Sequence, residues 1–574
     1  MASSTRKIVF IGVNSSYSHT MLSYGYVRAG NESFCPDCTW EYLETTINDD
    51  ELTFSLEIAA LEPDFVLGTA YLFNRDFLLR AAMRIKALLP SVAIFLGGPE
   101  FLGNNETFLR RFPAVDGVIR GDESSLYRIL NGAPAAPGFC RIGDRGDYED
   151  GGIAELPAGA SIPSPYLAGY FVRGKPFYQI ETSRGCNGRC TFCTSSCRNN
   201  IRYFPPERVR AELQALAAAG AQEIRVLDRT FNEPPERAIT LLAMFRDEFP
   251  GLRFHLEINP ARLTPELLAE LQSFPPGQLH VEAGVQTFNG NCLRLVRRPA
   301  TAAKTAAGLR QLLGCGNFAV HSDLIAGLPG QASADVVTDL TRLIELGPEE
   351  IQLENLKVLP GTPLAENPPS DLRRNPGPPY EVLQTSGFSP AELQAARQLS
   401  KIIDHYYNQP ELRRLFAWAW LTRPAFRTGF PAFLIHAGNP MIKVSPQQRL
   451  ERLAEFAASA DLPLLAELTR FVWLINGLPP EKYGLVLHKT VRGEIVPATA
   501  AILNRTDNDN ELKRYFIAEF SVDAAALLHS STPAWRQTPH RYLFYPLHGQ
   551  RLGRLVLLKY DAAASENHKE NPYL

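Results

Sequence analysis

The sequence contains no long hydrophobic run and little excess charge of either sign. Its 574 residues carry a net charge of −3, so electrostatics give no reason to expect nucleic acid as a partner. The densest apolar stretch of the C-terminal part, residues 415–421, is far shorter than the ~20 residues that a spanning helix needs. The first residues run into a strand-like pattern without the apolar segment of a signal peptide. We therefore expect a cytoplasmic protein without a membrane span.

Cysteine is scarce, and its nine residues do not suit a disulfide framework. An odd number of cysteines in a long chain without an export signal argues against paired disulfides. Four of them lie within twelve residues: Cys186, Cys190, Cys193 and Cys197. Clustering of this kind predicts a metal site. A separate pair, Cys35 and Cys38, has no further zinc ligands nearby in the sequence.

Two blocks of the chain alternate strand-like and helix-like segments. In the first block, the apolar runs that suit buried parallel strands are residues 8–13, 65–69, 92–96 and 117–120. Helix-like segments such as 77–89, with apolar residues at three- and four-residue spacing, lie between them. This alternation predicts an open, doubly wound α/β sheet, and such sheets bind ligands at the carboxyl ends of their strands.

The second block contains six strand candidates, at residues 177–182, 223–227, 254–257, 280–284, 318–324 and 351–356. The clearest helix between them covers residues 206–219, because Pro206 suits a first turn and Gly220 suits a helix end. Six strand–helix units predict a partial barrel with its chemistry at the C-terminal ends of the strands.

These blocks, together with stretches rich in proline, glycine or alanine, predict five segments. They are an α/β domain (1–135), a linker with one hairpin (136–175), a partial (β/α)6 barrel (176–366), a second linker (367–380) and a C-terminal domain (381–574). Residues 389–421 have a helical pattern rich in aromatic residues, and residues 542–560 have a strand-forming pattern. The predicted fold class is therefore α/β, with a Rossmann-like doubly wound domain, a TIM-type partial barrel and a mainly helical C-terminal domain.

The cysteine cluster directly follows the first strand of the second block, in the segment that begins Glu181-Thr-Ser-Arg-Gly. Two glycines in this loop allow tight backbone curvature. Structural zinc usually takes four ligands in two separated pairs, whereas Cys186, Cys190 and Cys193 lie in one loop. Three thiolates on a four-iron cluster leave one iron open for a ligand that is not protein. A purely structural zinc or iron–sulfur loop is the alternative.

This Cys-x3-Cys-x2-Cys spacing, with Phe192 before the last cysteine, resembles the radical SAM superfamily. The resemblance implies a [4Fe–4S] cluster on Cys186, Cys190 and Cys193 as the catalytic centre. Its open iron chelates the amino and carboxylate groups of S-adenosylmethionine (SAM). One electron then breaks the C5′–S bond and yields a 5′-deoxyadenosyl radical. The implied partners are a one-electron reductant, such as a flavodoxin or ferredoxin, and a small-molecule or peptide substrate.

Later strand ends extend the resemblance. Residues 282–287 resemble a Glu-x-Gly-x-Gln-Ser element that holds the methionyl and ribose parts of SAM, and 323–330 and 356–363 resemble elements beside the adenine. The usual Gly-Gly-Glu signature after the second strand is absent, and Asp228 stands in that region. The SAM-binding residues that the resemblance implies are Phe192, Asp228, Glu257, Glu282, Gln286, Asp323, Gly327 and Leu359.

The first block resembles the cobalamin-binding domain that precedes the barrel in one branch of the superfamily. The resemblance rests on residues 13–20, 46–49, 71–74 and 96–100. The cobalamin-binding residues that it implies are Asn14, Ser15, Ser16, Tyr71, Gly97, Gly98, Pro99 and Glu100. An Asp-x-His-x-x-Gly motif, which supplies a lower-axial histidine in other cobalamin proteins, is absent, and the neighbours of His19 do not match it. If cobalamin binds, we therefore expect no histidine ligand from below.

Together, these resemblances imply a cobalamin-dependent radical SAM enzyme, with C-methyl transfer to an unactivated carbon as the favoured reaction. The C-terminal region resembles an accessory domain of uncharacterised function found on some such proteins. A radical rearrangement or cyclisation without methyl transfer is one alternative. A non-catalytic protein that responds to cobalamin or to redox state is another. Cys197 stays open as a spare thiol, a redox partner or a catalytic group.

Overall fold

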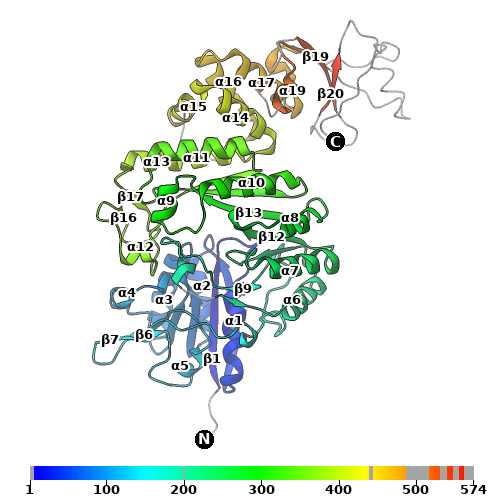
Figure 1. Ribbon diagram of the computed structural model, residues 1–574. Coiled ribbons are helices and arrows are strands. Elements are labelled where there is room, and N and C mark those ends of the chain that lie inside the picture. Colours follow the sequence, from blue (N-terminus) through cyan, green and yellow to red (C-terminus); the bar gives the residue numbers. More distant parts are fainter. Residues whose placement is uncertain are drawn as a thin grey trace. The chain divides into compact units, whose positions relative to one another are not determined.

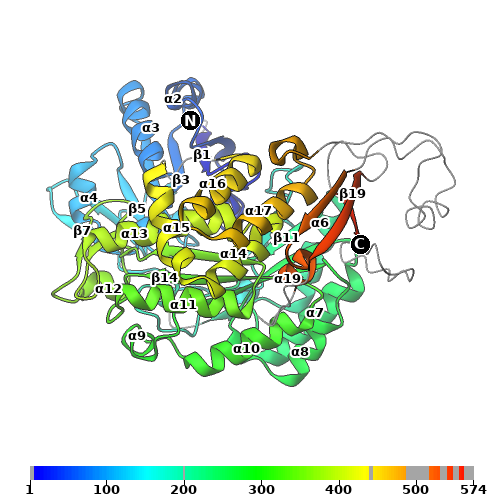
Figure 2. The ribbon, with the colours of Figure 1, turned by 90° about the horizontal axis from the view of Figure 1, so that it is seen from above.

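The computed structural model describes residues 5–197, 201–437, 444–485, 516–529, 539–546 and 555–560. The chain divides into two compact units, which Figures 1 and 2 colour along the sequence. The first unit contains residues 1–339 and 354–394, and the second contains 340–353 and 395–574. The predicted cluster loop and the predicted cobalamin-binding segments all belong to the first unit.

A seven-stranded sheet in the order β2-β1-β3-β4-β5-β6-β7 forms the N-terminal part of the first unit. Its parallel strands are β1 (Arg6–Asn14), β2 (Cys38–Thr46), β3 (Phe65–Thr69), β4 (Ala93–Gly97) and β5 (Gly117–Ile119). Antiparallel strands extend it beyond β5, namely β6 (Phe139–Ile142) and β7 (Tyr148–Asp150). The hairpin predicted between residues 136 and 175 is therefore part of the sheet. Strand β2 lies at the sheet edge and was not predicted.

Helices cover both faces of this sheet, as a doubly wound fold requires. On one face lie α2 (Glu51–Ala60), α3 (Arg75–Leu88) and α4 (Glu106–Arg111). On the other lie α1 (Leu22–Asn31) and α5 (Leu126–Leu130). Val9 and Ile11 of β1 are buried against the first set, and Ile8 and Phe10 against the second. Because successive side chains of a strand point to opposite faces, burial on both faces explains the continuous apolar run of β1.

The strand order reverses between β1 and β3, and a buried asparagine ties the ends of these strands together. The Asn74 side-chain amide donates to the carbonyl oxygens of Val13 (2.9 Å) and Thr69 (3.1 Å). Its carbonyl oxygen accepts a hydrogen bond from the backbone N–H of Tyr71 (2.8 Å). Doubly wound sheets bind ligands at such a switch point, outside the carboxyl ends of the strands.

A six-stranded sheet in the order β15-β14-β13-β12-β11-β8 follows. Its strands are β8 (Tyr178–Ile180), β11 (Glu223–Val226), β12 (Arg253–Ile258), β13 (Leu279–Gln286), β14 (Ala319–Ala326) and β15 (Glu350–Asn355). Neighbouring strands from β8 to β14 are parallel. The helices between them include α6 (Pro206–Ala218), α7 (Pro235–Glu248), α8 (Pro265–Gln272), α10 (Ala302–Cys315) and α11 (Ser333–Leu346). The six predicted strands and the partial barrel are thus confirmed.

The predicted start and end of α6 are also confirmed. Pro206 occupies the first helical position, where its missing N–H costs nothing. The helix ends at Ala218, and Gly220 adopts a φ of +87°, a left-handed conformation that glycine reaches without strain.

After helix α12 (Pro363–Glu366), the second predicted linker contains strand β16 (Arg373–Arg374), which pairs antiparallel with β17 (Val382–Gln384) just beyond it. These elements belong to the first unit. Neither the boundaries of this linker nor the other domain boundaries are fixed by the division into units, so they stay predictions.

The second unit is mainly helical, as predicted. Its helices include α14 (Pro410–Thr422), α15 (Pro424–Ala437), α16 (Pro446–Ser459), α17 (Pro463–Ile475) and α19 (Ala524–His529). A three-stranded antiparallel sheet joins β18 (Phe516–Phe520), β19 (His540–Pro546) and β20 (Leu555–Tyr560). Buried aromatic rings of Tyr406, Phe416, Phe426, Phe430 and Phe456 contact one another in its core. None of the helices described here combines the length and apolarity that crossing a membrane requires.

Replacing Asn74 by alanine tests whether its hydrogen bonds stabilise the strand ends at the switch point. The change leaves two buried carbonyl groups and the partly buried Tyr71 N–H without their partner, so we expect the free energy of unfolding to fall by about 1–3 kcal/mol. Chemical denaturation followed by circular dichroism measures this loss. Asn48→Ala, at an exposed position, is the matched control and should change stability by less than about 0.5 kcal/mol. Equal effects of the two substitutions would contradict a stabilising role of the Asn74 hydrogen bonds.

Candidate active site

The three predicted cluster cysteines line one cavity of about 190 Å³ at the carboxyl ends of the barrel strands. The loop that carries them follows β8 and lies between the two strands of a short antiparallel pair, β9 (Ser183–Arg184) and β10 (Arg202–Tyr203). The Cys193 N–H donates to the Cys190 carbonyl (3.1 Å), and the Gly188 N–H donates to the Cys186 sulfur (3.2 Å). The loop is also tied to the barrel, because the Thr191 N–H donates to the Val296 carbonyl (3.0 Å). Three thiols on one cavity are the donor set that a [4Fe–4S] cluster with an open iron requires.

A buried carboxylate fixes the start of this loop. Asp228, which follows β11, accepts hydrogen bonds from the backbone N–H groups of Thr182 (2.7 Å) and Ser183 (3.0 Å). It also accepts from both of their hydroxyl groups, at 2.6 Å each. The Arg237 guanidinium lies 3.9 Å away and donates to the Thr182 carbonyl. With its oxygens engaged in this way, Asp228 orients the cluster loop and does not reach into the cavity.

A positive charge stands beside the cluster thiols. Burial raises the pKa of the Cys190 thiol, and the nearby Arg298 guanidinium opposes that effect. Arg298 lines the same cavity and donates to the Gly284 carbonyl. An anchored arginine fork that faces a cluster with one open iron can hold an anionic group of the ligand on that iron, such as the carboxylate of an amino acid.

Five of the predicted SAM-binding residues line this cavity as well: Phe192, Glu257, Glu282, Gln286 and Asp323. Gln286 has a left-handed φ of +71°, and the pairing of β13 with β14 shifts register between Gly284 and Gln286. A Cβ atom on Gly284 would lie 2.9 Å from the Gln286 amide nitrogen and 3.3 Å from the Arg298 guanidinium. The bulge and this glycine therefore bring Gln286 and Arg298 to the same part of the cavity.

The carboxylates of this cavity have different electrostatic environments. Burial raises the pKa of Glu257 to about 7, against the opposing effect of Arg229, whose guanidinium lies 3.5 Å away. A hydrogen bond from His255 (3.2 Å) lowers the pKa of Glu282, so this side chain stays ionised. Burial raises the pKa of Asp323, which lies beside Glu282. Of the two carboxyl groups, Glu282 is therefore the one that ionises more readily.

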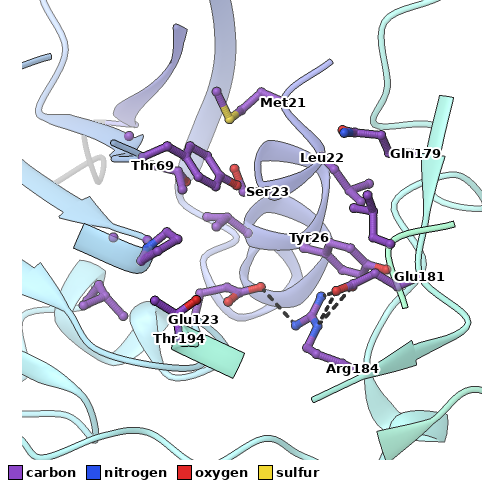
Figure 3. A pocket seen from close by; sticks show the side chains of 18 of the residues that line it. Met21, Leu22, Ser23, Tyr26, Thr69, Glu123, Gln179, Glu181, Arg184 and Thr194 are labelled. Atoms are coloured by element: carbon purple, nitrogen blue, oxygen red, sulfur yellow. Dashed lines mark hydrogen bonds and ion pairs between the residues drawn. The ribbon is translucent and has the colours of Figure 1, made fainter. Parts of the chain in front are cut away.

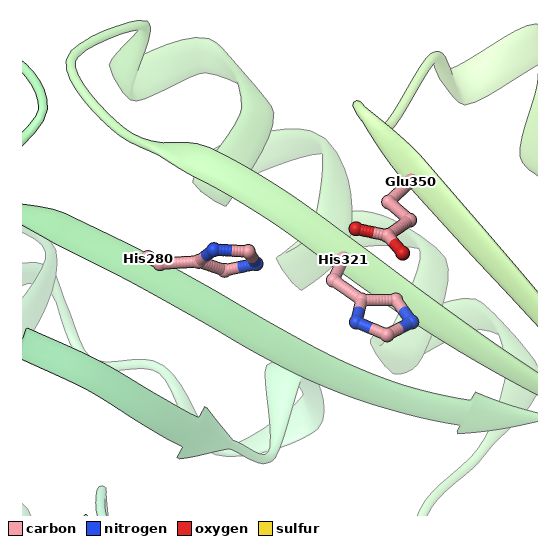
Figure 4. A group of neighbouring side chains, drawn as sticks. All are labelled: His280, His321 and Glu350. Atoms are coloured by element: carbon pink, nitrogen blue, oxygen red, sulfur yellow. The ribbon is translucent and has the colours of Figure 1, made fainter. Parts of the chain in front are cut away.

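Histidines form a row behind these carboxylates on adjacent strands. The His255 ring stacks on His280 with centroids 4.6 Å apart, and His280 meets His321 edge-on at 6.5 Å. Figure 4 shows His280 on β13 and His321 on β14. Burial lowers the pKa of His280 to about 4, and the neighbouring histidines add to the effect. His280 is therefore neutral at physiological pH.

A larger cavity, of about 540 Å³, lies between the N-terminal sheet and the mouth of the barrel. Six of the predicted cobalamin-binding residues line it: Asn14, Ser15, Tyr71, Gly97, Gly98 and Pro99. Its barrel side includes Gln179, Glu181 and Arg184 (Figure 3). The buried Thr20 hydroxyl on its wall has no hydrogen-bond partner among the described residues. Such an orphaned group needs a partner from a ligand or water.

An ion-pair cluster joins the two sides of the larger cavity. Arg184 of the barrel lies 2.6 Å from Glu181 and 3.6 Å from Glu123 of the N-terminal part (Figure 3). It also lies 3.6 Å from Asp122. Its guanidinium also stacks over the ring of Tyr26 at 4.4 Å. His19 lines this cavity too, with Nδ1 at 2.9 Å from the Ser16 hydroxyl. The wall thus combines apolar surface with hydroxyl and amide groups, which suits a broad macrocycle with polar substituents.

Several predicted site residues lie outside both cavities as the described residues form them: Ser16, Glu100, Asp228, Gly327 and Leu359. Glu100 is buried, accepts a hydrogen bond from the Tyr380 hydroxyl (2.8 Å) and pairs with Arg75 at 3.4 Å. The side chain of Cys197 falls outside the described residues, so its role stays a prediction.

The sequence reasoning missed several cavity residues, chiefly arginines: Arg184, Arg229, Arg262 and Arg298. Each follows a barrel strand or the cluster loop, but arginine is common at strand ends. Only the position of Arg229, directly after Asp228, offered a signal.

Comparison with known proteins assigns the barrel. Residues 180–343 match the radical SAM superfamily, and residues 371–521 match a protein family of unknown function, DUF4080. The cobalamin-dependent radical SAM methyltransferase TokK of Streptomyces tokunonensis is 25% identical over 402 residues, which cover 63% of this chain and 57% of TokK. A 2-(S-pantetheinyl)-carbapenam-3-carboxylate methyltransferase of Streptantibioticus cattleyicolor is 25% identical and is covered to the same extent. The chain therefore spans less than two thirds of these relatives.

Solved structures share the fold at low sequence identity. The radical SAM methyltransferase TsrM of Kitasatospora setae is 19% identical, with a TM-score of 0.52 over 68% of this chain and 82% of that one. The cobalamin-dependent SAM radical enzyme OxsB is 12% identical, with a TM-score of 0.56 over 89% of this chain and 77% of that one. The architecture of the predicted fold class is thus confirmed.

Replacing Asp228 by asparagine tests its control of the cluster loop. An amide keeps one acceptor oxygen and turns an NH2 group toward the donors of Thr182 and Ser183, so the loop should loosen. We expect the anaerobically reconstituted variant to lose iron to a chelator at least about tenfold faster than the parent protein. Asp247→Asn, on an exposed side chain, is the matched control and should behave like the parent. Equal iron retention in Asp228→Asn would contradict the positioning role.

Proposed function

Because residues 180–343 belong to the radical SAM superfamily, we propose that this chain is a cobalamin-dependent radical SAM C-methyltransferase. The observation that carries the proposal is the meeting of two cavities in one unit. One is lined by three cysteine thiols, and the other lies at the switch point of the N-terminal sheet. When bound, the cluster with SAM supplies a 5′-deoxyadenosyl radical, and cobalamin supplies a methyl group.

The residues of the smaller cavity suit the cluster and SAM. Cys186, Cys190 and Cys193 would hold the cluster, and Arg298 would hold the methionyl carboxylate. Glu282, kept ionised by His255, can accept hydrogen bonds from ammonium or ribose hydroxyl groups. Gln286 offers both a donor and an acceptor next to these charges.

The residues of the larger cavity suit a corrin. Gly97 and Gly98 line one wall of this cavity without side chains, and the Thr20 hydroxyl has no hydrogen-bond partner among the described residues. Solved structures of fold neighbours support this assignment, because TsrM binds cobalamin and a [4Fe–4S] cluster, and OxsB binds aqua-cobalamin and SAM. The names of the curated relatives, which include a carbapenam methyltransferase, favour methyl transfer.

The protein's own part is to place the reactants and to exclude water. The Arg184 ion-pair cluster connects the barrel mouth to the N-terminal part, so it holds together the two sides of the larger cavity. The same assignment implies a cytoplasmic enzyme that receives electrons from a flavodoxin or ferredoxin and acts on a small molecule or peptide.

Anaerobic reconstitution tests the proposal directly. The protein is loaded with iron and sulfide, with or without hydroxocobalamin, reduced, and given SAM. We expect 5′-deoxyadenosine in both preparations, and S-adenosylhomocysteine only in the preparation that contains cobalamin. Cys190→Ala should abolish 5′-deoxyadenosine, whereas Cys315→Ala, which removes a thiol outside both cavities, should not.

Each other outcome overturns a different part of the proposal. 5′-Deoxyadenosine without S-adenosylhomocysteine would replace methyl transfer by a rearrangement or cyclisation. Failure to cleave SAM, with the cluster intact by absorbance and electron paramagnetic resonance (EPR), would indicate a non-catalytic protein that responds to cobalamin or redox state.

A further inference from the structure

Arg229 stands where the two cavities meet. It follows β11 directly after Asp228, and it is the one residue of the described chain that lines both cavities. If the proposed function holds, the reacting carbon of the substrate must lie between the radical source in one cavity and the methyl source in the other. Arg229 therefore borders the space that the substrate occupies.

The Arg229 guanidinium has spare binding capacity, unlike Arg184 and Arg262, which also line these cavities. Its side chain is 55% exposed, against 14% for Arg184 and 37% for Arg262. Its ion pair with Glu257 is long, at 3.5 Å. Arg184 instead meets three carboxylates, and Arg262 is held by Glu233. Arginine stays protonated at all relevant pH values, so this charge faces the junction permanently.

The surroundings favour a singly charged partner. The groups that interact electrostatically with the Arg229 guanidinium include Glu257, Glu181, Glu282 and the Cys193 thiol, all of which are acidic. A phosphate dianion would be repelled by these carboxylates, whereas a carboxylate adds only one negative charge. A carboxylate also matches the planar fork of a guanidinium through two parallel hydrogen bonds.

We propose that Arg229 binds a carboxylate of the substrate, so the substrate of this enzyme is a carboxylic acid. This inference rests on the proposed function and adds the substrate class to it. Arg229 is then a specificity-determining residue, because a substrate that lacks the acid leaves the guanidinium without that partner.

The test compares an acid with its neutral isostere on the holoprotein. Hexanoate and hexanamide are titrated by calorimetry, at low ionic strength, into protein loaded with cluster, SAM and hydroxocobalamin. We expect hexanoate to bind at least about tenfold more tightly than hexanamide, as a charged hydrogen-bonded pair implies. Arg229→Gln should remove this preference, and Arg229→Lys should keep part of it. Arg253→Gln, at a 65% exposed arginine with a 3.7 Å ion pair, is the matched control and should retain the preference.

Three results would overturn the assignment. They are equal binding of acid and amide, an unchanged preference in Arg229→Gln, and a loss of SAM affinity in Arg229→Gln as large as the loss for hexanoate. The last result would place Arg229 on the carboxylate of SAM. Assays of 5′-deoxyadenosine and S-adenosylhomocysteine on the same preparations separate the two proposals. Their absence contradicts the proposed function, whereas a missing acid preference with both products formed contradicts only the role of Arg229.

Discussion

The hydrogen bonds that Asp228 accepts from Thr182 and Ser183 determine where the cluster loop leaves the barrel. A carboxylate removed from water is costly unless its oxygens are satisfied, and here two backbone and two hydroxyl donors satisfy them. Because the donors sit just before the loop and the acceptor sits at the end of the next strand, the loop and the barrel cannot shift independently. The cysteine thiols therefore line the same cavity as the carboxylates of Glu257, Glu282 and Asp323.

The two cavities use charge in different ways. In the smaller one, acidic side chains line the same cavity as the cluster thiols, and burial raises the pKa of Glu257 and of Asp323. Neighbouring side chains oppose this effect. The hydrogen bond from His255 lowers the pKa of Glu282, and the charge of Arg229 lowers the pKa of Glu257. In the larger one, Arg184 satisfies the acidic groups of both walls, which leaves hydroxyl groups and backbone for a large ligand. One cavity thus suits a small zwitterion, and the other suits a broad uncharged surface.

Local patterns in the sequence predicted most of the fold and the centre of the site. Apolar runs located ten strands of the two sheets, and cysteine spacing identified the cluster loop. Strand β2 escaped because, as an edge strand, it is only partly buried and carries Glu41 and Glu44 among its apolar residues.

Residue roles that depend on distant partners were not predictable from local patterns. Glu100 belongs to a Gly-Gly-Pro-Glu strand end that resembles a corrin contact, yet its partner, Tyr380, is 280 positions away in the chain. Asp228 looked like a ligand-binding acid, but whether an acid faces the cavity or the loop behind it depends on donors that only the fold brings near. The 55% exposure of the Arg229 side chain and its long ion pair with Glu257 likewise depend on the fold and not on the local sequence.

The central claim is that one unit holds the cluster and the corrin side by side. The most direct measurement is the microwave power saturation of the bound cob(II)alamin EPR signal, with the cluster reduced and no SAM present. We predict that the reduced cluster makes the cobalt signal relax markedly faster than in Cys190→Ala, which cannot assemble the cluster. Identical saturation curves for the two proteins, with cobalamin bound in both, would contradict the account.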